Sequence, residues 1–232
     1  MIFRCPLKIL AVETSSSSGS IALLEDRTLL SEWSAGSAGP HAAWLLPSIK
    51  AHLGSSGLHI SDIDLFAIAS GPGSFTGLRI GVSTVKGLAW PLGKKVAGVS
   101  TLAALAMNIP FSSRLVCPVL DARKGEVYAG LYDTSAGFPK AVIEDSVMTL
   151  KAFLEEISKK ALGSPVFLGK GLEAYSREIE ERAPSALMAP GLSLVRASNV
   201  GLLGFEKAGE AIEAAALAPV YLRRSEAEIK FG

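Results

Sequence analysis

The sequence predicts an α/β fold built from two copies of one structural unit. Each half opens with an apolar run that predicts a buried strand, and the strand ends in an acidic residue, Glu13 in the first half and Asp121 in the second. A polar turn, a second strand and an acidic turn follow in both halves. Helices and strands then alternate along the chain. The repeated order indicates an internally duplicated chain with two lobes.

The elements of the first half follow from apolar runs and the residues that interrupt them. Short apolar runs between polar turns predict a three-stranded meander, and a Gly/Ser linker then leads to a helix that opens with Pro40. A second helix ends at Gly93. In order, we expect strands at 8–12, 20–24 and 28–30, a linker at 35–39, a helix from 40, a strand at 65–69, a helix to about 92, a strand at 96–99 and a helix at 101–109.

The second half repeats this beginning and adds further helices. We expect strands at 115–120, 126–132 and 166–168, and helices at about 150–162, 172–181 and 197–210. The predicted lobes are 1–105, which carries the first two helices, and 106–232, whose last helix packs back on the first lobe. The fold class is therefore α/β, duplicated and two-lobed.

Composition excludes several classes of protein. The chain has 232 residues, of which 49% are hydrophobic and 19% charged, values that exclude disorder and a coiled coil. Its formal net charge is +1, without the basic excess of a freestanding nucleic-acid binder, so we expect weak nucleic-acid binding by the chain alone. Mean hydropathy is +0.36, but no apolar run predicts a membrane span.

The N-terminal residues and the cysteines predict a cytoplasmic protein. Arg4, Pro6 and Lys8 interrupt any signal-peptide run. Cys5 and Cys117 form neither a disulfide framework nor a metal knuckle, which is typical of buried thiols in a reducing cytosol.

A glycine-rich loop follows the strand at 65–69 and opens a helix. Its glycines lie at 71, 73 and 77, a spacing that fits neither the dinucleotide fingerprint nor the phosphate loop of nucleotide hydrolases. One interpretation is a capped turn with Ser74 or Thr76 as the N-cap. The other is a site for an anion or nucleotide, contacted by Gly73, Ser74 and Thr76 together with Glu13.

The first two helices carry apolar residues on more than one side. In the second helix, Gly77, Gly81, Thr84 and Leu88 share a face about 90° from the predicted core stripe. Glycine costs about 1 kcal/mol against alanine in a helix, so this face predicts close approach of a partner helix. Trp44 lies nearly opposite the core stripe of the first helix, where an exposed Trp is typical of an interface anchor. The alternative is a structural Trp that is covered by a neighbouring loop.

Several segments together resemble the bacterial TsaB (YeaZ) family. They are residues 69–81 (ASGPGSFTGLRIG), 98–102 (GVSTL), 121–128 (DARKGEVY) and the closing 219–223 (PVYLR), and the likeness covers nearly the whole chain. The resemblance implies an actin-like fold of the ASKHA, ribonuclease H-like type. It also implies a role in making threonylcarbamoyladenosine beside the tRNA anticodon.

The resemblance further implies how such a chain works. It would be a noncatalytic scaffold that binds and activates the catalytic paralogue TsaD through its first two helices, with the ATPase TsaE as a further partner. Alone it would form a homodimer, and it would meet tRNA only through the complex. It would hold no tight cofactor and no metal, with ATP or ADP at the complex interface, and would not associate with membranes.

Two departures bear on this interpretation. TsaD-like proteins carry two metal-binding histidines four residues apart, and the matching positions here are Thr101 and Leu105. Glu13 stands where the family leads us to expect Asp, which weakens a nucleotide site in the first lobe. The alternatives are a glycoprotease-type peptidase, which needs a metal pair or an activated nucleophile, and an actin-like small-molecule kinase, which needs a catalytic Asp and phosphate loops.

Overall fold

The computed structural model describes residues 5–35 and 40–223, which form two compact units. Unit 1 contains the chain up to Thr101 together with Val195–Val220, and unit 2 contains Leu102–Leu194 and resumes at Tyr221. The expected boundary after residue 105 therefore moves to 101, since α3 (Thr101–Ala106) enters unit 2 after its first residue. The expectation that the second lobe runs unbroken from 106 to the end is also corrected, because Val195–Val220 belong to unit 1.

The sheet of unit 1 has the strand order β11-β5-β4-β1-β2-β3. Its strands are β1 (Lys8–Glu13), β2 (Gly19–Glu25), β3 (Thr28–Ala35), β4 (Leu65–Gly71), β5 (Lys95–Ser100) and the short β11 (Ile212–Glu213). The first three strands form an antiparallel meander, whereas β1, β4 and β5 run parallel. Parallel neighbours need crossover connections, and the two long helices of this unit supply them.

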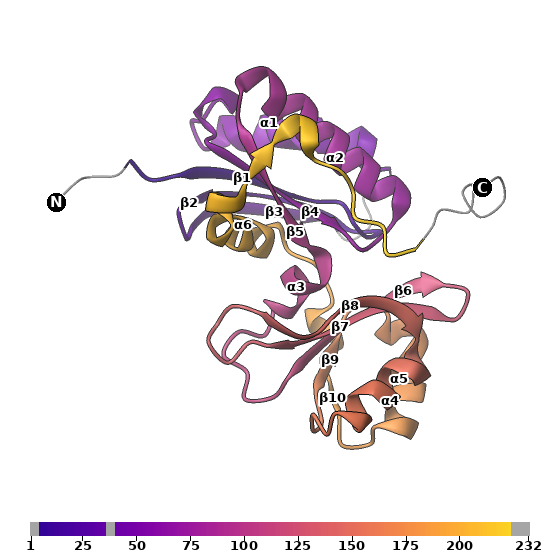
Figure 1. The fold of residues 1–232 in the computed structure, drawn as a ribbon. Helices are drawn as coiled ribbons and strands as arrows, with labels where there is room; N and C mark the ends of the chain where they lie inside the picture. The colour runs from indigo at the N-terminus through magenta and orange to yellow at the C-terminus, as the bar shows by residue number, and fades with distance from the viewer. Residues whose placement is uncertain (1–4, 36–39, 224–232) are drawn as a thin grey trace. The chain divides into compact units, whose positions relative to one another are not determined.

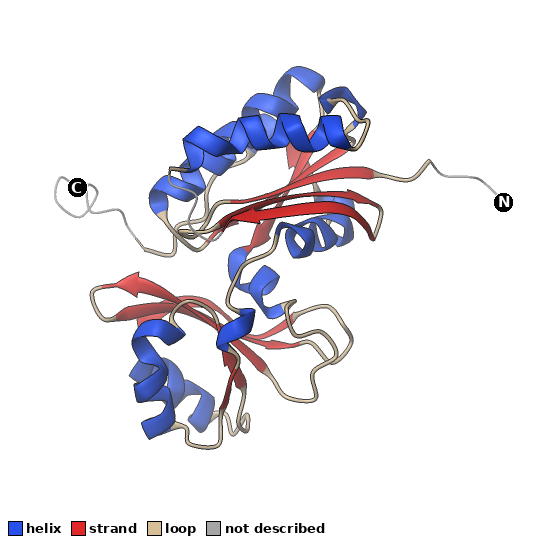
Figure 2. Cartoon of the chain, turned by 180° about the vertical axis from the view of Figure 1, so that it is seen from behind, coloured by secondary structure: helices blue, strands red, loops and turns tan. Residues whose placement is uncertain are grey.

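Helices cover both faces of this sheet. Helices α1 (His41–Ser55) and α2 (Phe75–Ala89) lie side by side over one face, and α6 (Ala197–Glu206) covers the other (Figure 1, with Figure 2 from behind). The core beneath α1 and α2 contains Leu45, Ile49, Val82 and Val85, all nearly inaccessible.

The opposite face of the sheet is built for a close helix. Ala22, Ala11, Ala67 and Ala97 stand in register across four neighbouring strands, so this row presents only methyl groups. Helix α6 places its glycines over this surface: a Cβ at Gly204 would come well within 3.0 Å of Ala67 Cβ. Small residues on both surfaces thus let α6 pack closely on the sheet.

Unit 2 repeats the strand plan of unit 1. Its strands are β6 (Val116–Arg123), β7 (Glu126–Asp133), β8 (Lys140–Thr149), β9 (Val166–Leu168) and β10 (Leu187–Met188), in the order β10-β9-β6-β7-β8. Read from β8 inward, this is the order β3-β2-β1-β4-β5 of unit 1, and the parallel and antiparallel pairs correspond. Helices α4 (Leu150–Lys159) and α5 (Leu172–Arg182) again supply the crossovers. The predicted duplication is confirmed.

Short one-turn helices complete the structure. They are η1 (Ile60–Asp62), η2 (Trp90–Leu92), η3 (Pro190–Leu192), η4 (Ala208–Glu210) and η5 (Ala214–Ala216). The last segment of unit 1, which we call the strap (207–220), runs from α6 past the edge of β5. Lys86 Nζ on α2 donates to the carbonyls of Ala215 and Leu217, which fixes the strap to this helix. No helix among residues 5–35 and 40–223 is long and apolar enough to cross a membrane.

Candidate functional site

Helices α1 and α2 present one side to solvent, which we call the outer helical face. It comprises Ala43, Leu46, Pro47 and Lys50 of α1, Ser83 and Gly87 of α2, and Trp90 just beyond α2. Leu46 is 51% exposed and Trp90 69%, and a Cβ on Gly87 would meet nothing within 4 Å. Neither helix contains an acidic residue. The face is therefore mostly apolar, made largely of small residues, with Lys50 as its charged member and no negative charge.

The predicted glycine seam is not part of this face. Gly77 and Gly81 are buried, and both point at the loop that follows β1. A Cβ at Gly77 would lie well within 3.0 Å of the Thr14 carbonyl oxygen, and one at Gly81 equally close to Thr14 Oγ1. The expectation that these glycines receive a partner helix is therefore wrong, because a segment of the same chain already fills the space.

Trp44 also lies elsewhere than the helical pattern predicts. Its ring packs where Gly19 has no side chain, 4.9 Å from the ring of Trp33 and 5.6 Å from that of His41. It is half-buried, so the alternative of a Trp covered by its own chain describes it better than an outward anchor. Thr84 and Leu88 are half-buried beside the outer helical face, and their role in partner binding stays a prediction.

The glycine-rich loop adopts the capped-turn arrangement. Ser74 is the N-cap of α2, and its Oγ accepts a hydrogen bond from Gly77 N at 3.3 Å. Thr76 is exposed within the first turn. Gly73 packs against Ser15, where a Cβ would lie well within 3.0 Å of the carbonyl oxygen. An anion at Gly73, Ser74 and Thr76 stays a prediction.

Two acidic residues, Glu13 at the end of β1 and Asp121 near the end of β6, play corresponding roles in the two units. Glu13 is fully buried, and its Oε1 accepts hydrogen bonds from Ser15 N and Ser15 Oγ. Asp121 is exposed, and its Oδ1 accepts from Arg123 N at 2.8 Å. Each carboxylate thus binds the backbone amide two residues further on. The duplication extends to this hydrogen bond, which holds the turn after the first strand.

A polar cluster surrounds the turn between β6 and β7. Arg223 Nη1 donates to the Ala122 carbonyl at 2.5 Å and lies 3.6 Å from a Glu126 carboxylate oxygen. Burial raises the pKa of Tyr128 against the opposing effect of the Arg223 charge. Burial also raises the pKa of Tyr175, to which the nearby Asp121 contributes.

The positions that correspond to the paralogue's metal ligands carry no metal-binding side chain. Thr101 and Leu105 are completely buried, and neither supplies an imidazole nitrogen. Across the described ranges 5–35 and 40–223, His, Cys, Asp and Glu form no group of three or more that could hold a metal ion.

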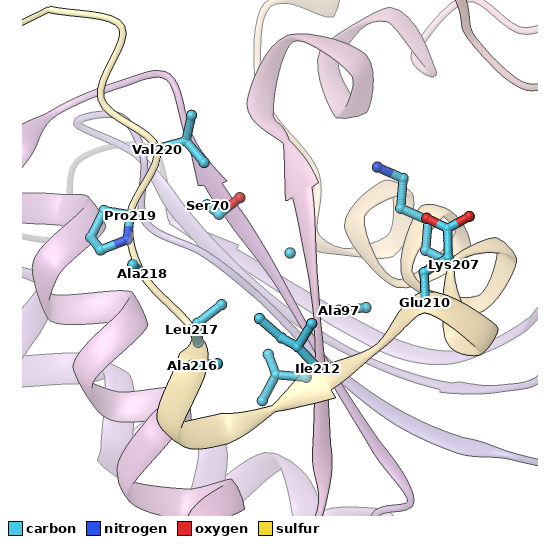
Figure 3. Close-up of a pocket in the computed structure, with 12 residues that line it drawn as sticks. Ser70, Ala97, Lys207, Glu210, Ile212, Ala216, Leu217, Ala218, Pro219 and Val220 are labelled. Atoms are coloured by element: carbon cyan, nitrogen blue, oxygen red, sulfur yellow. The ribbon is translucent and has the colours of Figure 1, made fainter.

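A pocket of about 370 Å³, which the sequence does not predict, lies in unit 1 between the strap and β5. Figure 3 shows Lys207 and Glu210 together at one end and Ser70 with Val220 at the other. Between them the lining is apolar and includes Ala97, Ile212 and Leu217. Because β11 pairs with only Lys95 and Val96, the pocket lies where the edge of β5 is left uncovered by that strand.

Comparison with known proteins decides the family. Residues 36–231 match the family model described as TsaD: tRNA N6-adenosine threonylcarbamoyltransferase. The chain is 35% identical over 228 residues to the tRNA threonylcarbamoyladenosine biosynthesis protein TsaB of Bacillus subtilis, an alignment that covers 97% of this chain and 98% of that protein. The chain belongs to the TsaB (YeaZ) family.

Solved structures agree with this membership. A Pseudomonas aeruginosa crystal structure, described as an uncharacterized protein with similarity to peptidase YEAZ, matches with a TM-score of 0.78 and 32% identity over 94% of this chain and all of that one. The chain shares the fold alone with component A of (R)-2-hydroxyglutaryl-CoA dehydratase from Acidaminococcus fermentans. That structure matches with a TM-score of 0.50 and 12% identity over 88% of this chain and 99% of that one. The TsaB-family chain thus has the duplicated, actin-like α/β fold expected from its sequence.

Proposed function

We propose that this TsaB-family protein is a noncatalytic subunit in the biosynthesis of threonylcarbamoyladenosine in tRNA, and that it binds and activates TsaD. The named relatives support the biosynthetic role. The match to the TsaD family model supports common ancestry with the catalytic subunit. Thr101 and Leu105 support a noncatalytic role for this chain, since they replace the paired histidines that a metal-dependent paralogue needs.

The outer helical face is the surface that carries this proposal. Exposed apolar side chains that gather on one surface are typical of protein interfaces, and Leu46 and Trp90 are both more than half exposed here. Gly87 and Ser83 leave room for a partner backbone to approach. TsaD is the proposed occupant, and the homodimer of the free chain would use the same face. TsaE and tRNA would join through the complex.

A matched pair of leucines tests the proposal. Leu46 of α1 and Leu187 of β10 are both 51% exposed, but only Leu46 belongs to the outer helical face. Leu46→Asp places a charge that the interface would bury without a partner, so TsaD binding should weaken by at least about tenfold, a change of about 1.4 kcal/mol. Leu187→Asp should bind TsaD like the unmodified chain.

Calorimetry with purified TsaD measures the binding, and a tRNA modification assay with TsaD and TsaE measures the activity. Both should fall together in Leu46→Asp. Equal TsaD affinity in the two leucine variants would exclude the outer helical face as the docking surface. An unmodified chain that neither binds TsaD nor supports modification would contradict the proposed function itself.

A further inference from the structure

The loop between β1 and β2, which we call the serine loop (14–18), is tied to the first turn of α1. His41 opens this helix, and its Nε2 lies 2.8 Å from the Ser16 carbonyl oxygen. Because a carbonyl oxygen only accepts, Nε2 must carry the proton. The side chain is 9% exposed, and its Nδ1 makes no hydrogen bond within the described part of the chain. His41 is therefore held by a single hydrogen bond.

The same loop is tied to the first turn of α2. Ser74 N donates to the Ser15 carbonyl at 2.7 Å, and Thr14 Oγ1 donates to the Gly77 carbonyl at 2.9 Å. The Glu13 carboxylate holds the loop internally by accepting from Ser15. One short loop thus binds the beginnings of both helices that form the outer helical face.

His41 also sets the ring that covers the loop. The His41 and Trp44 rings meet edge to face at 73°, with their centroids 5.6 Å apart. Trp44 in turn contacts Trp33 on β3 at 4.9 Å. Turning the His41 ring would therefore disturb both the Ser16 hydrogen bond and the stacking of Trp44. The imidazole therefore connects α1 to the serine loop directly, and to β3 through the Trp44 ring.

We propose that His41 is a positioning residue for partner binding: through the serine loop it fixes the first turn of α1 against that of α2. This inference rests on the proposed function, in which TsaD docks on these two helices. A face held in its bound arrangement avoids the ordering cost that a loose pair of helices would incur on association. Because His41 is buried within unit 1, it would act on TsaD binding through the helices rather than by contact.

Isosteric substitutions test this role. Glutamine carries its amide nitrogen near the position of imidazole Nε2, whereas asparagine carries it near Nδ1. His41→Gln should therefore keep the bond to Ser16 and nearly normal TsaD affinity. His41→Asn and His41→Leu should leave the Ser16 carbonyl unpaired and bind TsaD about tenfold more weakly.

A stability-matched control separates positioning from folding. Gly204→Ala crowds α6 on the opposite face of the sheet and destabilises unit 1 without touching α1, α2 or the serine loop. The melting temperatures of both variants are measured, and Gly204→Ala should retain TsaD affinity even where its melting temperature falls as far as that of His41→Leu. If His41→Leu binds no worse than Gly204→Ala, or if His41→Gln is as impaired as His41→Leu, the positioning role is refuted.

Hydrogen exchange of the free chain decides the inference independently of TsaD. Amides in the first turns of α1 and α2 should exchange faster in His41→Leu and His41→Asn than in His41→Gln. Unchanged exchange in all three variants would refute the positioning role of His41, even where TsaD binds. If His41→Leu exchanges faster but the unmodified chain does not bind TsaD, the positioning role stands and the docking proposal is rejected.

Discussion

Alanine substitutions along α2 distinguish a helix face that packs internally from one open to a partner. Gly81 and Gly87 lie in the same helix, but a Cβ at Gly81 would press on Thr14 Oγ1 and lie 3.1 Å from Ile68 Cδ1, whereas one at Gly87 meets nothing. Helix propensity favours alanine by about 1 kcal/mol at both positions. Forcing a methyl group into a packed site costs about 1–3 kcal/mol, and that cost applies at Gly81 alone.

The two variants should therefore differ in stability by about 1–3 kcal/mol. Gly87→Ala should be more stable than the unmodified chain, and Gly81→Ala less stable than Gly87→Ala. For a protein of this size that difference corresponds to roughly 2–12 °C in melting temperature. Gly77→Ala should be the least stable, because its Cβ would meet the Thr14 backbone carbonyl, which cannot rotate away.

Tryptophan fluorescence is a suitable measurement, because Trp33, Trp44 and Trp90 are the three tryptophans of the chain and all belong to unit 1. Urea unfolding followed in this way reports unit 1 without a contribution from unit 2. Equal stabilities of Gly81→Ala and Gly87→Ala would refute the assignment of the Gly77/Gly81 side to internal packing. For the same reason Gly81→Arg should impair folding. A Gly81 that faced a partner helix, as its spacing predicts, would instead give a variant that folds and fails only in partner binding.

Two further predictions concern groups outside α2. Burial raises the pKa of Cys117, so in native protein the exposed Cys5 should react quickly with a thiol reagent and Cys117 only on unfolding. The contribution of the buried Cys117 thiol to stability is fully present below the ordinary pKa of 9.0 and is lost as pH rises beyond it. Cys117→Ala should remove this loss of stability at high pH. The Glu32 carboxylate of β3 accepts hydrogen bonds from Ser198 N and the Arg196 side chain, and so caps the start of α6. Glu32→Ala should therefore lower the free energy of unfolding by about 1–2 kcal/mol in urea. A change within error would show that this cap is dispensable.

The strand plan was largely predictable because its signals are local. Glu13 and Asp121 each follow an apolar run and precede a polar turn, and this repetition identified the duplication. The sequence does not predict β8, because KAVIEDSVMT has Lys140, Glu144 and Asp145 among its apolar residues. Such charges are typical of an edge strand, and β8 lies at the edge of its sheet. Strands β10 and β11 have two residues each, too few for a periodic signal.

The candidate site was harder to predict because periodicity does not reveal what covers a helix face. The spacing of Gly77 and Gly81 correctly indicates close approach of another segment. Only the structure shows that this segment is Thr14, more than sixty residues earlier in the chain. The prediction for Trp44 is wrong for the same reason, since the residues that it packs against, Gly19 and Trp33, lie on β2 and β3. Helical spacing places Gly87 on a different face of α2 from Gly77 and Gly81, but it does not show which of the two faces stays exposed.

The paired acids provide a last test of where function resides. In an actin-like kinase, acids at the ends of the first strands would serve phosphate or metal, and neutralising them would abolish activity. Here Glu13 and Asp121 each accept the amide two residues ahead, a bond that a carboxamide oxygen also makes. Glu13→Gln and Asp121→Asn should therefore preserve tRNA modification by the complex with TsaD and TsaE to within about twofold, a difference of less than 0.5 kcal/mol. Loss of modification in Asp121→Asn with TsaD binding intact would show that this carboxylate acts in the chemistry, and that the subunit does more than present a docking surface.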